Sequence, residues 1–338
     1  MPTATETLYA LANPSKTIYS HYINNLMKVL FIDNTHPLLV EKLSTIGFKC
    51  EFFNGLYAEE LYDSIAAYTG IVIRSKFRID KDFINRAVNL KFIARVGAGM
   101  DSIDVAYAEK RGIALLNSPE GNRIAVGEHT VGMLLCLLNK INTADAQIRN
   151  GIRKREENRG VEVCGKTIGI IGYGNMGSAF AKCVSGFGAH VLAYDKYKTG
   201  FSDSFVKESN LKTIFEKTDI LSIHVPLTIE THYMVDEPFI NKFKKNFYLI
   251  NTSRGKVVKT SALTDALING KIKGTALDVI EYEADSFENL SYSELPPSYT
   301  YLLQAENVVM TPHIAGWTEE SKVKLVEVLA EKISRLNL

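Results

Sequence analysis

One glycine motif, Gly172-Tyr173-Gly174-Asn175-Met176-Gly177, constrains the fold of this chain more than any other feature. The apolar run 167–171 precedes the motif, and a helix-compatible stretch that begins at Ser178 follows it. A second apolar run, 190–194, is followed at once by Asp195, 18 residues after Gly177. A strand, a glycine turn, a helix and an acidic residue in this order are typical of a dinucleotide-binding unit, in which the pyrophosphate lies at a helix N-terminus.

Each position of the motif has its own expected role. Gly172 permits the tight turn, Gly174 lets the backbone approach the pyrophosphate, and Gly177 lets the helix pack closely on the strand. Asp195 is expected to accept hydrogen bonds from the ribose hydroxyls and to repel a 2′-phosphate, which predicts NAD rather than NADP. Lys196 weakens this preference, because a cation there could meet a phosphate.

Composition limits the class of protein. The 338 residues are 46% hydrophobic and 23% charged, with a formal net charge of +1, which gives no global field for nucleic acid or a membrane surface. Apolar runs stay well short of 18 residues, so no transmembrane helix is expected. The four cysteines are far apart and form no CxxC pair, so we expect no metal site, and reduced thiols in a cytoplasmic protein.

Two series of strands and helices follow an N-terminal arm, 1–26, which is rich in Thr, Ser and Ala. One hypothesis is that translation begins at Met27 and the arm is dispensable. The first series predicts a parallel flavodoxin-like domain with strands at 27–32, 48–53, 70–74, 92–96 and 112–116. The second follows a long helix at 124–139 and predicts a doubly wound dinucleotide-binding domain with six strands, at 167–171, 190–194, 219–223, 247–251, 274–277 and 307–310.

The predicted fold class is therefore α/β, with two doubly wound parallel-sheet domains. The last helix, 319–336, is expected to return to the first domain. A Rossmann NAD-binding domain, 124–316, would then be inserted in a flavodoxin-like substrate domain made of 27–123 and 317–338.

An arginine, a glutamate and a histidine follow the last three predicted strands. Because the carboxyl ends of parallel strands meet at one edge, Arg254, Glu283 and His313 can converge there. His313 can exchange a proton with a carbonyl oxygen, Glu283 can bind the other imidazole nitrogen, and Arg254 offers a planar fork for a carboxylate. Any one of them alone would be interpreted as a surface or turn residue. His129 lies within the predicted helix and is interpreted as structural.

Over residues 27–338 the chain resembles the D-isomer-specific 2-hydroxyacid dehydrogenases. The resemblance is carried by the glycine motif, by Asn251-Thr252-Ser253-Arg254-Gly255, by Leu277-Asp278-Val279 with Glu283, and by Thr311-Pro312-His313. It implies Arg254, Glu283 and His313 as the catalytic residues, NAD as cofactor, and a homodimer built on the cofactor domain. The cofactor contacts that we predict from the motif and the resemblance together are Gly172, Gly174, Asn175, Met176, Gly177, Asp195, Pro226, Thr252, Asp278 and Gly316.

The substrate is expected to be a small 2-hydroxy or 2-oxo acid. Val96, Gly97, Ala98 and Gly99 end the fourth strand, where successive N–H groups can form a nest for the carboxylate. Arg74, Ser75 and Asn122 resemble the positions that contact phosphate in phosphoglycerate dehydrogenases, and the loop 74–78 carries three cations. A solvated basic loop explains the same residues equally well.

Several functions stay open at this point. The resemblance points to 3-phosphoglycerate oxidation in serine synthesis, without the C-terminal serine-sensing domain of longer members, since the chain ends soon after its last helix. Reduction of glyoxylate, hydroxypyruvate or pyruvate, as in D-lactate dehydrogenases, is the alternative. A different class is an NADH-sensing binding protein, because corepressors of this fold keep the same three residues.

Overall fold

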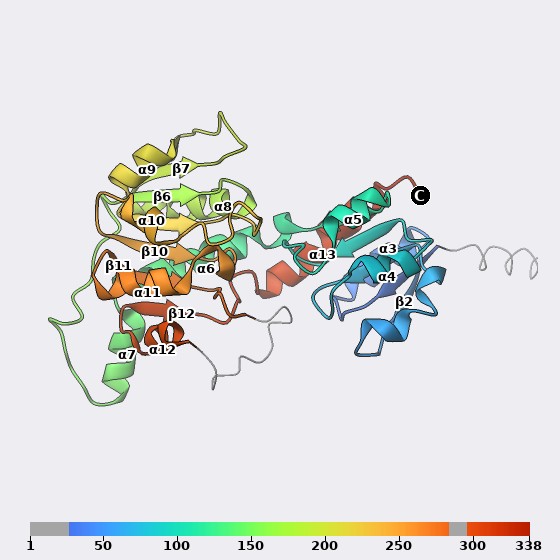
Figure 1. Cartoon of the computed structure of the whole chain (residues 1–338), viewed down its shortest axis with the longest axis horizontal. Coiled ribbons are helices and arrows are strands. Elements are labelled where there is room, and N and C mark those ends of the chain that lie inside the picture. Colours follow the sequence, from blue (N-terminus) through green and yellow to red (C-terminus); the bar gives the residue numbers. More distant parts are fainter. Residues whose placement is uncertain (1–26, 284–295) are drawn as a thin grey trace, which may run out of the picture. The chain divides into compact units, whose positions relative to one another are not determined.

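The computed structural model describes residues 27–283 and 296–338, so the expected arm 1–26 lies outside the described residues. These residues form two compact units. The first contains the described residues up to Ser118 together with Leu325–Leu338, and the second is Pro119–Lys324. Each unit is built on its own parallel sheet with helices, as Figure 1 shows, and the predicted α/β fold class is confirmed.

The first unit has a five-stranded sheet in the order β2-β1-β3-β4-β5, which is the flavodoxin-like order. Its strands are β1 (Lys28–Phe31), β2 (Lys49–Phe52), β3 (Gly70–Ile73), β4 (Phe92–Arg95) and β5 (Ala114–Asn117). Its helices are α3 (Leu38–Thr45), α4 (Lys81–Arg86), α5 (Val105–Lys110), the 3-10 turns Ala58–Leu61 and Ile65–Ala67, and the C-terminal part of α13 (Glu319–Ser334).

Side chains of β1 alternate between two apolar clusters, one on each face of this sheet. Leu30 belongs to one cluster and Val29 and Phe31 to the other. Leu329 and Ile333 of α13 belong to the same cluster as Val29, so this helix covers that face. Burial on both faces explains why the strands of this unit appear as continuous apolar runs in the sequence.

The second unit has a seven-stranded sheet in the order β12-β11-β10-β9-β6-β7-β8. Its strands are β6 (Thr167–Ile171), β7 (His190–Tyr194), β8 (Val206–Glu208), β9 (Ile220–Ile223), β10 (Phe247–Asn251), β11 (Ile272–Leu277) and β12 (Val308–Met310). The prediction of six strands was wrong, and the strand that it missed is β8. This strand has only three residues, Val-Lys-Glu, of which Val206 alone is buried. Such a segment has no apolar run to reveal it.

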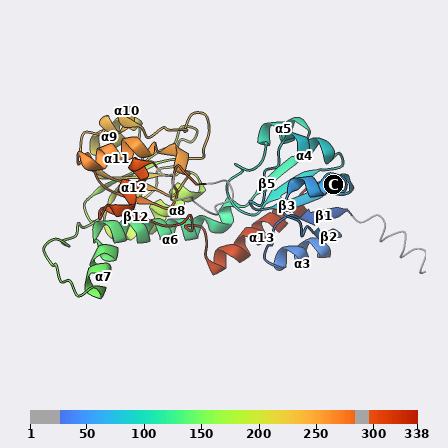
Figure 2. The ribbon, with the colours of Figure 1, turned by 60° about the horizontal axis from the view of Figure 1, so that its bottom comes forward.

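The helices of this unit cover both faces of its sheet. They are α6 (Pro119–Leu138), α7 (Ile141–Arg149), α8 (Asn175–Val184), α9 (Leu211–Lys217), α10 (Glu237–Asn241), α11 (Thr260–Ile268), α12 (Pro297–Gln304) and the 3-10 turns Ser185–Phe187 and Gly255–Val257. Figure 2 shows α6 beside α8 along one face. A Cβ atom at Gly127 would lie 3.0 Å from the backbone of Ala179, so glycine permits this close crossing.

The helix α6 begins at Pro119, five residues before the expected start at 124. Proline is favoured in the first turn of a helix, where its missing N–H is not needed, whereas the apolar spacing used for the prediction begins later. In the described part of the chain, no single helix is both long and apolar enough to span a membrane, and α6 and α7 meet these two conditions only together, across a bend of 61°.

Candidate active site

The glycine loop lies between β6 and α8 with a geometry that only glycine allows at two positions. Gly172 has φ +92°, and a Cβ there would collide with the carbonyl oxygen of His224. A Cβ at Gly177 would collide with the carbonyl oxygen of Gly172. At Gly174, by contrast, a Cβ would meet no described atom within 4 Å, so the loop is open on the side where a phosphate would approach. Helix α8 then presents its first N–H groups to that side.

Asp195 lies beside this loop because its carboxylate is held by main-chain donors. Its Oδ2 accepts a hydrogen bond from Tyr173 N at 2.8 Å, and its Oδ1 accepts from Tyr197 N at 2.9 Å and Lys198 N at 3.1 Å. Lys196 pairs with Glu230 at 2.7 Å, and both side chains are half exposed. These residues fit an NAD ribose, since the acidic group is placed at the loop and the neighbouring cation is already paired.

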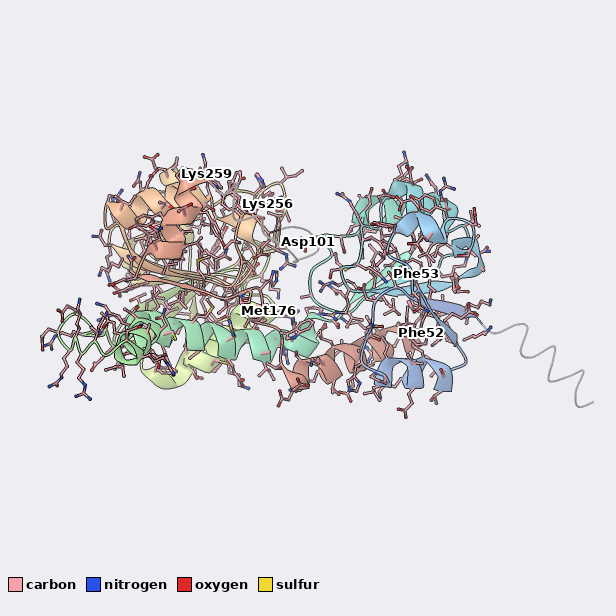
Figure 3. The ribbon with its side chains drawn as sticks, turned by 90° about the horizontal axis from the view of Figure 1, so that it is seen from below. Phe52, Phe53, Asp101, Met176, Lys256 and Lys259 are labelled. Carbon is pink, nitrogen blue, oxygen red and sulfur yellow. The ribbon has the colours of Figure 1, made fainter. Side chains whose placement is uncertain are left out.

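The loops after β9 and β10 supply two other predicted cofactor contacts. Pro226 follows the buried His224, and its carbonyl oxygen accepts from Thr231 Oγ1 at 2.6 Å. The buried Thr252 Oγ1 lies 3.2 Å from Thr130 Oγ1 of α6. Figure 3 labels Met176 in the first turn of α8, and Lys256 and Lys259 in the segment that follows β10.

Arg254 is presented by a tight turn after β10. Asn251 Oδ1 accepts from Ser253 N at 3.1 Å, and Asn251 Nδ2 donates to the carbonyl oxygen of Arg254 at 3.0 Å. A Cβ at Gly255 would collide with the backbone of Ile280, so glycine lets this turn approach the loop after β11. The Arg254 Nη1 donates to the carbonyl oxygen of Ser253 at 2.7 Å.

His313 and Glu283 meet directly. His313 Nδ1 lies 2.8 Å from Glu283 Oε2, and Glu283 Oε1 accepts from Ile280 N at 2.7 Å, which fixes the carboxylate. Both side chains are partly exposed, at 28% and 20%. Because a carboxylate only accepts hydrogen bonds, Nδ1 carries the proton and Nε2 is the nitrogen that can exchange one with a substrate.

Asp278, the residue directly after β11, is almost fully buried, at 1% exposure. Its carboxylate accepts from Thr311 Oγ1 at 2.6 Å and from the N–H groups of Ile314 and Ala315, both at 2.8 Å. A carboxylate has about four acceptor positions, so three protein donors leave room for one more, such as a carboxamide N–H.

Gly316 and Asn122, predicted for cofactor and substrate, lie together. A Cβ at Gly316 would press on the side-chain amide of Asn122, and the buried Oδ1 of Asn122 finds no hydrogen-bond donor among the described residues.

The substrate residues predicted in the first unit lie on two neighbouring loops. The N–H groups of Arg74, Ser75 and Lys76 all point to Asp33 Oδ2, at 2.6, 3.2 and 3.4 Å. Arg95 Nε donates to the carbonyl oxygen of Arg74 at 3.3 Å, which ties this loop to the end of β4.

The loop 96–99, which follows β4, is held by hydrogen bonds to β3 and to the end of β5. Gly97 has φ +143°, and its N–H donates to Ser118 Oγ at 3.2 Å. The carbonyl oxygen of Ala98 accepts from Asn117 Nδ2 at 2.7 Å, and Val96 N donates to Ile73 at 2.9 Å. A carboxylate nest would therefore depend on Ala98 and Gly99.

Asp33 was not among the predicted site residues, and His129 was predicted to be structural. Asp33 lies just after the end of β1, and Arg254, Glu283 and His313 lie in the same way after the ends of β10, β11 and β12. His129 Nε2 lies 3.1 Å from Thr311 Oγ1 and 3.6 Å from Asp278 Oδ1, a contact that helical spacing alone does not reveal.

The fold and these loops define an α/β protein with a dinucleotide-binding unit. Residues 131–315 match the family described as D-isomer specific 2-hydroxyacid dehydrogenase, NAD binding domain. The chain is 39% identical to the glyoxylate reductase of Thermofilum pendens over 282 residues, which cover 81% of this chain and 80% of that protein. The chain belongs to the D-isomer specific 2-hydroxyacid dehydrogenase family, as the resemblance predicted.

Two further relatives show the range within this family. The D-3-phosphoglycerate dehydrogenase of Archaeoglobus fulgidus is 35% identical over 309 residues, which are 91% of this chain and 56% of that protein. This chain thus spans a little over half the length of that relative. A D-lactate dehydrogenase from Aquifex aeolicus, solved with NAD and lactic acid, superposes with a TM-score of 0.79 at 28% identity, covering 90% of this chain and 95% of that one.

Proposed function

We propose that the protein is an NAD-dependent dehydrogenase that interconverts a D-2-hydroxy acid and its 2-oxo acid. The observation that supports this most is the 2.8 Å contact between His313 Nδ1 and Glu283 Oε2 in the unit that carries the glycine loop. A histidine backed by a carboxylate is a general acid and base suited to a hydroxyl–carbonyl pair at neutral pH.

Each residue has a separate part in this reaction. Bound NADH would supply the hydride for reduction, on the glycine loop and α8. His313 Nε2 gives a proton to the oxygen of the carbonyl group as it becomes a hydroxyl, and Glu283 stabilises the imidazolium that exists before this transfer. Arg254 binds the carboxylate of the acid through its planar fork. In the oxidation direction His313 accepts the hydroxyl proton.

We propose the first unit as the substrate domain and the second as the cofactor domain. The Asp33 contacts support a role for the loop 74–76, because three main-chain donors on one carboxylate fix the shape of this loop. Within this unit, Arg74 and Ser75 are the residues that we propose for a second anionic group of the substrate, and the N–H groups of Ala98 and Gly99 are proposed for its carboxylate. Asn122, which belongs to the second unit, is a separate candidate for binding an anionic group.

The substrate is tested by NADH oxidation with 3-phosphohydroxypyruvate, hydroxypyruvate, glyoxylate and pyruvate. If the phosphorylated acid gives the highest kcat/KM by orders of magnitude, the loop 74–78 binds phosphate and the protein is a phosphoglycerate dehydrogenase. If an unphosphorylated acid gives the highest value, the loop is a basic surface and the enzyme is a 2-oxo acid reductase. Tight NADH binding with only trace turnover of every acid would contradict both and favour an NADH sensor.

We also propose a cytoplasmic homodimer. All four cysteines are free thiols, as expected in a reducing compartment. The helix α7 projects from the body of its unit (Figure 1), and its Ile141 and Ile148 are 50% and 56% exposed. A second copy of the chain would cover them. Light scattering of the native protein and of Ile148→Lys tests this, and a monomeric native protein would contradict it.

A further inference from the structure

The loop that carries His313 is held by one buried carboxylate. The strands β11 and β12 are paired with Leu277 opposite Met310, so Asp278 and Thr311 lie next to each other where the two strands end. Asp278 accepts from Thr311 Oγ1 before His313 in the chain and from Ile314 N and Ala315 N after it. The three donors therefore lie on both sides of His313 in the chain, and Asp278 holds the loop before and after it.

These hydrogen bonds are important because His313 has a left-handed backbone conformation, with φ +55°. Residues with a Cβ avoid this region unless the surrounding contacts impose it. The N–H of His313 also donates to the carbonyl oxygen of Asp278 at 2.8 Å. The direction of the imidazole toward a substrate thus depends on Asp278.

The hydroxyl of Thr311 connects Asp278 to a second histidine. Its neighbours are Asp278 Oδ1 at 2.6 Å, His129 Nε2 at 3.1 Å and Met133 Sδ at 3.7 Å. A hydroxyl has one proton, and the ionised carboxylate is both the nearest and the strongest acceptor. The Thr311 oxygen therefore accepts from His129, which requires the proton of His129 on Nε2.

His129 brings helix α6 into this arrangement. The imidazole is 23% exposed, and its Nε2 lies 3.6 Å from Asp278 Oδ1. The next residue, Thr130, contacts Thr252 in the loop that leads to Arg254. Helix α6 thus touches the loops of two proposed catalytic residues through adjacent side chains.

We propose that His129, Thr311 and Asp278 form a positioning network that orients His313 for proton transfer, with hydrogen bonds donated from His129 Nε2 to Thr311 and from Thr311 to Asp278. None of the three exchanges a proton with the substrate. The inference rests on the proposed role of His313 as the acid and base.

The test measures kcat, KM for the best acid of the panel above and Kd for NADH in a set of variants. Thr311→Val keeps the shape of the side chain and removes the hydroxyl, so kcat should fall about 10- to 100-fold, the usual cost of misplacing a catalytic group. Thr311→Ser restores the hydroxyl and should keep kcat within about twofold of the native enzyme. The Kd for NADH should stay within about twofold in both.

His129→Leu should lower kcat by roughly three- to tenfold, and adding it to Thr311→Val should cause no further loss, because both changes break the same chain of hydrogen bonds. His190→Leu is the matched control, since His190 is an exposed histidine at the amino end of β7, and it should keep native kcat. Melting temperatures identify any variant that is simply unfolded.

Three outcomes would overturn the network. These are native kcat in Thr311→Val, Thr311→Ser as slow as Thr311→Val, and losses that multiply in the double variant. His313→Gln, measured in parallel, distinguishes failure of the network from failure of the proposed function. A slow His313→Gln with a native Thr311→Val overturns the network alone, whereas a native His313→Gln overturns the proposed function and the network together.

Discussion

Asp33 in the first unit and Asp278 in the second each hold a loop in place by accepting hydrogen bonds from it, but their surroundings differ. Each follows a strand, and each gathers the loop that follows a neighbouring strand. Asp33 is partly buried, and its partners among the described residues are main-chain N–H groups, those of Arg74, Ser75 and Lys76. Asp278 is buried and also accepts from the side chain of Thr311, which His129 contacts in turn.

The two carboxylates differ in whether their contacts depend on the identity of the side chains in the loop that they hold. A loop held through main-chain donors keeps its shape whatever side chains it carries, so the loop 74–76 is free to carry groups for different acids. A loop held through a side-chain hydroxyl and a second histidine depends on those residues. We therefore expect the chemistry to be fixed by the second unit and the choice of acid by the first.

The largest effect should come from removing the buried carboxylate. Asp278→Ala leaves three donors without an acceptor in the interior, so the free energy of unfolding should fall by roughly 3–5 kcal/mol. Urea denaturation measures this. A loss below about 1 kcal/mol would mean that the loop relaxes freely and that the two contacts do not differ as described.

Acid should weaken the second unit through His224, which lies beneath the glycine loop. Burial lowers the pKa of His224 from 6.5 to about 3, and its Nε2 lies 2.8 Å from Ser222 Oγ. The folded chain keeps this histidine neutral while the unfolded chain protonates it, so its contribution to stability is complete above pH 6.5 and is lost as pH falls toward 3.

The free energy of unfolding should therefore fall by about 1.4 kcal/mol per pH unit below pH 6 on account of this one group. Between pH 7 and pH 5 the native protein should lose roughly 2 kcal/mol more than His224→Asn in urea titrations. Equal losses in the two proteins would show that His224 takes up its proton without unfolding.

Removal of the partly buried carboxylate should cost less stability and change a different kinetic constant. Asp33→Ala frees three N–H groups that water can reach, so unfolding should become easier by only about 1–2 kcal/mol. The KM for the acid should rise roughly three- to tenfold with kcat nearly native, because we propose that the loop 74–76 binds the substrate and takes no part in the proton transfer. A fall in kcat with an unchanged KM would contradict the expectation that the first unit determines the choice of acid and the second unit the chemistry.

An exposed pair beside Asp195 should give the smallest effect. Glu230 lies 2.7 Å from Lys196 Nζ and holds the pKa of Lys196 above its ordinary value. Glu230→Gln releases that cation toward a 2′-phosphate, so kcat/KM for NADPH should rise about two- to fivefold with unchanged thermal stability. Lys196→Gln in the same chain should cancel the gain, and a gain that persists without Lys196 would exclude this explanation.

The elements predicted well from the sequence are those with a strong local signal. The strands 167–171, 190–194 and 247–251 have the predicted bounds, and the polar residues that follow β10, β11 and β12 include the His313–Glu283 pair. The strand β8 was missed because three residues with one buried side chain carry no periodic pattern.

The hydrogen bonds that hold the loops could not be predicted from the sequence, because they join residues far apart in the chain. Asp33 meets Arg74 N across 41 residues of sequence, and His129 meets Thr311 across 182. Main-chain donors have no sequence signature, and a histidine within a helix points equally well to several neighbours. Only the packed positions of β1, β3 and α6 decide which groups meet.

The central claim is that His313 exchanges the proton in a dehydrogenase reaction. It is tested most directly by NADH oxidation at saturating acid with the native enzyme and with His313→Gln, with Kd for NADH measured by fluorescence in both. If His313 exchanges the proton, kcat should be about 10²- to 10⁴-fold lower in the variant, with nearly native NADH binding. A native kcat in His313→Gln would contradict it.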